Sequence, residues 1–118
     1  MPKDVPQPDL ENEGAAPSGH KSVVLETRMT LTNIRGLHAR ASAKFVSCAG
    51  AFLSTVEVTS HNSVGAETVI ADSVMELLML GSCVGEDITI RATGPEPDAK
   101  AALAVLEALV ANNFGELS

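Results

Sequence analysis

The sequence predicts an α+β protein, an open-faced sandwich in which three helices cover one face of a four-stranded antiparallel sheet. Two observations support this fold class. Four segments alternate apolar and polar residues or are rich in β-branched residues, as strands are. Three other segments place apolar residues at helical spacing. In chain order these segments form the series β-α-β-β-α-β-α, which a single layer of helices over one sheet can accommodate.

The first part of the predicted domain contains a strand, a helix and a second strand. Apolar and polar residues alternate over residues 23–32, which predicts the first strand. A turn at residues 33–36 follows, and a helix is expected over about residues 39–49. Alternation returns over residues 52–59 as the second strand, and residues 61–65 are of turn-forming types.

The last part contains two strands and a closing helix. Residues 67–70 are partly β-branched and predict a third strand, and residues 87–92 alternate as a fourth. Pro97 suits the first turn of the closing helix, and Asp98 supports that helix start through the helix dipole. The buried stripe of this helix is expected to consist of Ala102, Val105, Leu106 and Leu109.

A short helix is expected at residues 74–80, between the third and fourth strands. Asp72 or Ser73 offers an N-cap, and Gly81 ends the helix. Almost every side chain in it is apolar, and a small protein cannot easily bury all sides of a helix. We therefore expect a partner-docking surface rich in flexible methionine, formed by Val74, Met75, Leu78 and Met79.

The length and the composition predict one small domain preceded by a tail. The chain has 118 residues, enough for one core without disulfides. Residues 1–20 are rich in proline and acids and poor in apolar anchors, which predicts a disordered tail, with the folded domain at residues 21–118. No signal peptide is visible, and no apolar run reaches the roughly 20 residues of a membrane span. A cytoplasmic location is therefore expected.

Charge and residue types argue against several classes of function. The net charge of −7 and the lack of a basic block disfavour nucleic-acid binding. Cys48 and Cys83 stand in apolar surroundings and are expected to be reduced, in or near the core. A metal site built from His38, Cys48 and His61, which lies in a predicted turn, matches no standard spacing. We therefore expect neither a metal nor a cofactor.

His38 and Arg40 lie where the predicted turn becomes a helix, and Gly36 allows that turn. The start of a helix presents unpaired backbone N–H groups and a partial positive charge, so it favours anions such as phosphate. An imidazole at this position can accept a phosphoryl group, and a guanidinium beside it can bind the oxygens of that group. The sequence thus predicts an anion site at which His38 reacts.

These residues resemble a known family. The order of elements, the run Gly36-Leu37-His38-Ala39-Arg40, and Ser73 followed by an apolar helix are similar to HPr, the histidine-containing phosphocarrier of the phosphoenolpyruvate-dependent phosphotransferase system. The resemblance covers roughly residues 22–114. It implies the HPr-like open-faced sandwich described above.

The resemblance also implies partners and residue roles. His38 would accept a phosphoryl group on Nδ1 from phospho-enzyme I and pass it to an enzyme IIA-type acceptor. Arg40 would bind the phosphate, together with the backbone N–H groups of Ala39 and Arg40. Ser73 matches the serine that HPr kinase/phosphorylase modifies, and Lys44 matches a partner-facing position. Such a carrier is expected to be a monomer with no turnover of its own.

Some positions depart from the common pattern of the family. Ala41 stands where proline commonly follows the site arginine, and Asp72 stands where a lysine commonly precedes Ser73. Other partner-facing positions that often carry lysine are here Ser47, Gly50 and Glu76. These departures resemble the regulatory, nitrogen-related branch of the phosphotransferase system more than the sugar-uptake branch.

Two other classes of function are alternatives to a phosphocarrier. One is a docking module that acts through the helix at residues 74–80, with Ser73 as a modification site and no phosphoryl transfer. The presence of both His38 and Arg40 argues against it. The other is a stand-alone enzyme, for which the sequence offers no second acid–base group and no glycine-rich nucleotide loop.

Overall fold

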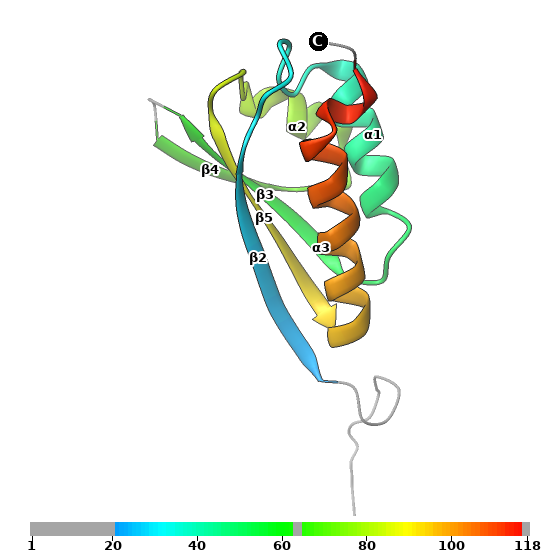
Figure 1. The fold of residues 1–118 in the computed structure, drawn as a ribbon. Coiled ribbons are helices and arrows are strands. Elements are labelled where there is room, and N and C mark those ends of the chain that lie inside the picture. Colours follow the sequence, from blue (N-terminus) through cyan, green and yellow to red (C-terminus); the bar gives the residue numbers. More distant parts are fainter. Residues whose placement is uncertain (1–20, 63–64, 117–118) are drawn as a thin grey trace, which may run out of the picture.

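The computed structural model describes residues 21–62 and 65–116, so the predicted tail at residues 1–20 lies outside the described residues. Among them the structure contains four strands, three α-helices and a short 3₁₀ turn (Figure 1). In chain order these elements are β2 (Ser22–Thr30), α1 (Ala39–Ala49), β3 (Thr55–Asn62), β4 (Gly65–Ile70), α2 (Val74–Leu80), β5 (Asp87–Pro95), α3 (Glu96–Ala111) and η1 (Asn113–Gly115).

The strands form one antiparallel sheet in the order β2-β5-β3-β4. The register places Ile90 at the centre, opposite Thr27 on one side and Val58 on the other. All three helices lie on one face of the sheet (Figure 1). The predicted α+β class and the open-faced arrangement are confirmed.

The core lies between the sheet and the helices. Side chains of a strand alternate between its two faces, so alternate residues are buried over 56–60 of β3 and 88–92 of β5. Phe45 of α1, Leu77 of α2 and Leu106 of α3 are fully buried against them. Burial of a side chain of this size contributes about 2 kcal/mol to the free energy of folding, so these three residues hold each helix to the sheet.

The second strand is shifted from its predicted position. The backbone N–H groups of Leu53 and Ser54 donate to the carboxylate of Asp98, over 3.1 and 2.8 Å, and so do not pair with a neighbouring strand. The strand therefore begins at Thr55. It then continues to Asn62, so the expectation that His61 lies in a turn is wrong. The His61 ring instead pairs with the hydroxyl of Thr89 on the open face of the sheet.

Two expectations about burial are also wrong. Val105 of α3 is 42% exposed, because the helix presents a different stripe to the sheet. The buried residues of that stripe are Ala99, Ala102, Leu106 and Val110. Cys83 is exposed, with its thiol donating to the carbonyl of Gly81, whereas Cys48 packs against the core as expected.

After α3 the chain makes a left-handed turn that the sequence analysis did not predict. Asn113, Phe114 and Gly115 have φ angles of 54°, 55° and 77°. Left-handed backbone is unfavourable for a residue such as phenylalanine, so its surroundings must stabilise it. The side chain of Phe114 is fully buried in the core, which supplies that stabilisation. This turn brings the end of the described chain back to the start of α1 (Figure 1).

No helix in the described part of the chain is long and apolar enough to span a membrane.

Candidate functional site

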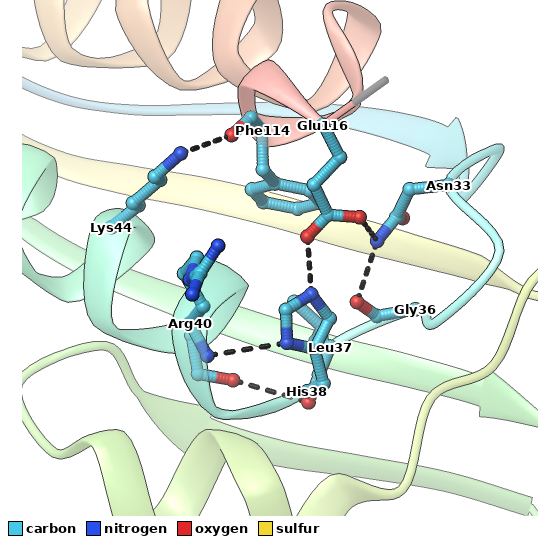
Figure 2. A network of polar contacts seen from close by, with 9 residues as sticks. Asn33, Gly36, Leu37, His38, Arg40, Lys44, Phe114 and Glu116 are labelled. Carbon is cyan, nitrogen blue, oxygen red and sulfur yellow. Dashed lines mark hydrogen bonds and ion pairs between the residues drawn. The ribbon is translucent and has the colours of Figure 1, made fainter. Parts of the chain in front are cut away.

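His38 is the N-cap of α1. Its backbone is extended (φ −76°, ψ −179°), and its Nδ1 accepts a hydrogen bond from the backbone N–H of Arg40 at 3.2 Å (Figure 2). A capping side chain in this position pairs with one of the N–H groups that have no partner within the helix. The lone pair of Nδ1 therefore points at the N-terminus of α1, where the helix dipole favours an anion.

The turn before His38 is held against the loop that follows α2. Gly36 has φ +61°, and a Cβ at this position would lie 2.4 Å from the carbonyl oxygen of Ser82. Only glycine allows this close approach together with left-handed backbone. Leu37 then donates its N–H to the same carbonyl at 3.1 Å. The peptide that leads into His38 is thus fixed against the backbone of Ser82.

The other ring nitrogen of His38, Nε2, contacts the Oε2 atom of Glu116 (Figure 2). The second carboxylate oxygen of Glu116 accepts a hydrogen bond from the side-chain amide of Asn33 at 3.1 Å. The same amide donates to the carbonyl of Gly36 at 2.8 Å. Asn33 is only 1% exposed, so its amide is fixed in place and links the site turn to the end of the chain.

The charge of Glu116 defines which nitrogen of His38 carries the proton. Burial raises the pKa of the Glu116 carboxyl, but the hydrogen bonds from His38 and Asn33 lower it by more, so its pKa lies below the ordinary value. Glu116 is therefore an ionised acceptor at neutral pH. We therefore assign the proton of the neutral His38 ring to Nε2, where it is donated to Glu116. Nδ1 then keeps its lone pair.

The two basic residues of the motif have different surroundings. Arg40 is exposed, and its guanidinium makes no hydrogen bond or ion pair with any residue that the structure describes. It lies near the His38 ring (Figure 2). Lys44, one turn further along α1, donates from Nζ to the carbonyl oxygen of Phe114 at 2.6 Å. Arg40 is thus available to an incoming anion, whereas Lys44 fixes the left-handed turn η1.

α2 packs beside α1 and presents part of its apolar surface to solvent (Figure 1). Met75 and Met79 are 64% and 75% exposed, and Leu77 is fully buried. Val74 and Leu78, which were also expected on the docking surface, are half-buried. Ser73 is the N-cap, with its hydroxyl accepting from the N–H of Glu76 at 3.3 Å. The helix is therefore buried on one side only.

No three His, Cys, Asp or Glu side chains within residues 21–62 and 65–116 are placed to hold a metal ion.

Glu116 and Asn33 are site residues that the sequence analysis missed. Asn33 was assigned to a turn, and Glu116 falls after the last predicted helix. Their roles depend on η1, which requires non-glycine residues in left-handed backbone. A single acid a few residues beyond a closing helix is too common a pattern to indicate a site.

The fold and the site together define a class: a small open-faced sandwich with a histidine capping the first helix, its Nδ1 facing the helix N-terminus. The family model described as "PTS HPr component phosphorylation site" matches residues 25–112 of this chain. The chain therefore belongs to the HPr family of phosphocarriers of the phosphotransferase system.

Individual relatives agree with this assignment. The chain is 40% identical over 93 residues to the phosphocarrier protein HPr of Cupriavidus necator, covering 79% of this chain and 98% of the relative. It is 38% identical over 89 residues to the phosphocarrier protein NPr of Proteus mirabilis, covering 75% and 93%. The crystal structure of HPr-C-His from Thermoanaerobacter tengcongensis aligns with a TM-score of 0.65 at 32% identity, covering 80% of this chain and 99% of that one.

Proposed function

We propose that His38 accepts a phosphoryl group on Nδ1 from phospho-enzyme I and passes it to an enzyme IIA-type acceptor in the cytoplasm. The observation that carries this proposal is the orientation of the ring: Nδ1 accepts from the N–H of Arg40 and so faces the N-terminus of α1. Residues 21–118 would form the carrier domain and residues 1–20 a tail. Phosphoryl transfer depends mainly on positioning and charge stabilisation, and the partner enzymes would supply what His38 and Arg40 do not, in both directions of transfer.

In the transfer step the lone pair of Nδ1 forms a bond to phosphorus. The bond between phosphorus and the leaving atom of the donor breaks, and the leaving atom keeps the electron pair. The ring then carries the phosphoryl group on Nδ1 and the original proton on Nε2, and so has a positive charge. Transfer to the acceptor reverses this sequence: an acceptor atom attacks phosphorus, and Nδ1 recovers its lone pair.

Arg40 would hold the phosphoryl oxygens in two ways. Its backbone N–H, which now donates to Nδ1, can donate to a phosphoryl oxygen once Nδ1 is occupied. Its exposed guanidinium can pair with the other oxygens, and charge-assisted pairs of this kind are stronger than neutral hydrogen bonds. The N–H of Ala39, the first residue of α1, lies at the same helix start.

Partners would bind on the solvent-exposed surface of α2, which Met75 and Met79 form with the half-buried Val74 and Leu78, and they would also contact Lys44 of α1. Ser73 would be a regulatory phosphorylation site for HPr kinase/phosphorylase. A phosphate there would add negative charge beside the docking surface while remaining close to a helix N-terminus. Mass spectrometry after incubation with ATP and the kinase should show one added phosphate, absent in Ser73→Ala. An unmodified protein would leave Ser73 as a helix cap only.

A regulatory role in the nitrogen-related branch is favoured over sugar uptake. The support comes from the residues at the partner-facing positions, where Ser47, Gly50 and Glu76 replace the lysines that are common in the sugar system. Among these partner-facing positions only Lys44 is basic, and its Nζ already donates to the carbonyl of Phe114. The chain should accept phosphate faster from a nitrogen-type enzyme I than from a sugar-type one. The reverse preference would contradict the branch assignment without affecting the carrier role.

The carrier role is tested with ³²P-labelled phosphoenolpyruvate and enzyme I. The wild-type chain should become labelled, and the label should be labile in acid and stable in alkali, as expected for phosphohistidine. His38→Ala should remain unlabelled, whereas His61→Ala, a matched change on the open face of the sheet, should label normally. Label that persists in His38→Ala would refute the assignment. A wild-type chain that binds enzyme I without becoming labelled would instead support the docking module.

A further inference from the structure

We propose that Glu116, held by Asn33, is a positioning residue that fixes His38 in the tautomer and ring orientation needed for attack by Nδ1. This inference rests on the proposed function and adds to it a residue that is distant in sequence from the motif.

Both oxygens of the Glu116 carboxylate are engaged. Oε2 contacts Nε2 of His38, and Oε1 accepts from the amide of Asn33 at 3.1 Å. The amide of Asn33 is itself oriented by the carbonyl of Gly36 at 2.8 Å, and Asn33 is buried. The carboxylate is therefore held on the side away from His38 by a group that cannot easily rotate. A carboxylate bound at both oxygens has a defined direction and orients the ring that donates to it.

The backbone that carries Glu116 is also fixed. The buried side chain of Phe114 holds η1 in the core, and the Phe114 carbonyl accepts from Lys44 at 2.6 Å. The hydroxyl of Thr32 donates to the side-chain oxygen of Asn113 at 2.5 Å. Two contacts from separate parts of the chain thus hold η1, in addition to the core. The left-handed turn places the Glu116 carboxylate against the His38 ring. This placement accounts for a backbone conformation that is unfavourable by itself.

The proton on Nε2 is what makes Nδ1 reactive. A neutral imidazole exists as two tautomers, and only the form protonated on Nε2 has a lone pair on Nδ1. An ionised carboxylate at Nε2 stabilises that form and opposes the other, because it cannot donate to an unprotonated Nε2. When Nδ1 bonds to phosphorus, the ring gains a positive charge while Nε2 keeps its proton. The carboxylate of Glu116 then lies opposite that charge.

The first test measures the tautomer in the unphosphorylated full-length chain, so its outcome does not depend on any transfer. The ring nitrogens of ¹⁵N-labelled histidine report the tautomer, and His38→Ala identifies the signals of His38. The wild type should show Nε2 protonated and Nδ1 unprotonated. Glu116→Ala should shift both nitrogens toward a mixture of the two forms. Glu116→Gln should shift them as well, because Oε1 accepts from Asn33 and Oε2 from Nε2 in the wild type, and an amide can accept with only one of its two terminal atoms.

The second test measures the rate of phosphorylation by enzyme I. Glu116→Ala should be phosphorylated about tenfold more slowly than the wild type, or more slowly still. Removing a group that orients a histidine ligand usually has an effect of this size. Glu116→Gln should also be slower than the wild type, since its amide cannot accept from both Asn33 and Nε2. Glu67→Gln makes the same change of charge on the exposed strand β4 and should behave as the wild type. An amide fingerprint spectrum checks that each variant retains the fold.

The proposal is overturned if Glu116→Ala keeps both the wild-type tautomer and the wild-type rate. It is also overturned if Glu116→Gln matches the wild type in both measurements, since a carboxylate that accepts at both oxygens would then not be the relevant interaction. Failure of the proposed function appears differently, as a wild-type chain that takes up no phosphate on His38 although its tautomer responds to Glu116.

Discussion

The backbone N–H of Arg40 donates to Nδ1 of His38 over 3.2 Å, so one residue of the motif orients the other before any phosphate is present. This bond makes two predicted site residues parts of the same helix start. The Arg40 guanidinium makes no hydrogen bond or ion pair with any described residue, whereas Lys44, its neighbour one turn away, donates to the carbonyl of Phe114. The two basic residues of α1 are therefore expected to respond differently to substitution.

Replacing Arg40 by alanine should slow phosphoryl transfer without unfolding the protein. The variant keeps the backbone N–H that caps His38 but loses the guanidinium. The loss of a charge-assisted hydrogen bond corresponds to about a tenfold to hundredfold lower rate. Rapid-quench measurement of transfer from enzyme I checks this, with Lys100→Ala on α3 as the control. A rate equal to that of the control would remove Arg40 from the mechanism.

Replacing Met75 by glutamate should weaken partner binding more than it lowers stability. Met75 is 64% exposed on α2, so a charge there remains solvated in the free protein but is buried on docking. NMR titration with the acceptor protein should show at least about tenfold weaker binding, which is the effect of losing a well-buried interface contact. Val24→Glu should bind normally, because Val24 is exposed and alternates along β2 with Val23 and Leu25, which pack against the core on the face that the helices cover. A variant that chiefly unfolds would place Met75 in the core instead.

Replacing Ser73 by alanine should lower the free energy of unfolding by about 1 kcal/mol, the usual cost of losing an N-cap hydroxyl. The hydroxyl accepts from the N–H of Glu76, and alanine leaves that donor without a partner in the helix. Urea denaturation provides the measurement. Ser47→Ala, at an exposed position inside α1, should cost nothing. Equal stabilities for the two variants would show that the cap contributes little.

Asp98 should make the stability of the fold depend on pH in the acid range. Burial raises the pKa of its carboxyl, but the hydrogen bonds from Ser54 and Leu53 lower it by more, so the pKa lies below its ordinary value of 3.8. A carboxyl whose pKa is lower in the folded state stabilises the fold fully above the unfolded-state pKa. That contribution is lost as the pH falls through the lower, folded-state pKa.

Asp98→Asn should therefore cost about 1 kcal/mol or more at pH 7, where the charged hydrogen bonds are present. The difference in free energy of unfolding between the variant and the wild type should shrink as the pH falls from about 4 toward about 2. The wild-type carboxyl is then protonated and, like the amide of asparagine, uncharged. Urea denaturation at several pH values measures both effects, with the exposed Asp72→Asn as control. A difference that does not change with pH would show that the ionised form of Asp98 does not matter.

Much of the fold follows from periodicity. The bounds of α1 and α2 agree with the predicted ranges, because a glycine follows each helix and side chains that can cap them precede it. The start of β3 could not be predicted, because it depends on Asp98, which lies more than forty positions away in the chain. Its carboxylate accepts from the N–H groups of Leu53 and Ser54, which therefore do not pair with a neighbouring strand. Local patterns do not contain such long-range competition.

The candidate site divides in the same way. His38 and Arg40 are recognisable because a turn, a helix start and two chemically suited side chains occur together in one short run. Glu116 reaches them only through η1, whose left-handed backbone is stabilised by the buried side chain of Phe114. Neither the turn nor its burial has a local sequence signal. The contribution of the C-terminal segment to the site is therefore visible only in three dimensions.

The central claim is that Nδ1 of His38 carries the phosphoryl group. The most direct measurement is the ³¹P–¹⁵N coupling in the chain phosphorylated by enzyme I and labelled with ¹⁵N-histidine. We expect a single phosphorus coupled to Nδ1 of His38, with the proton still on Nε2. Phosphorus coupled to Nε2, or found on any other residue, would contradict the account.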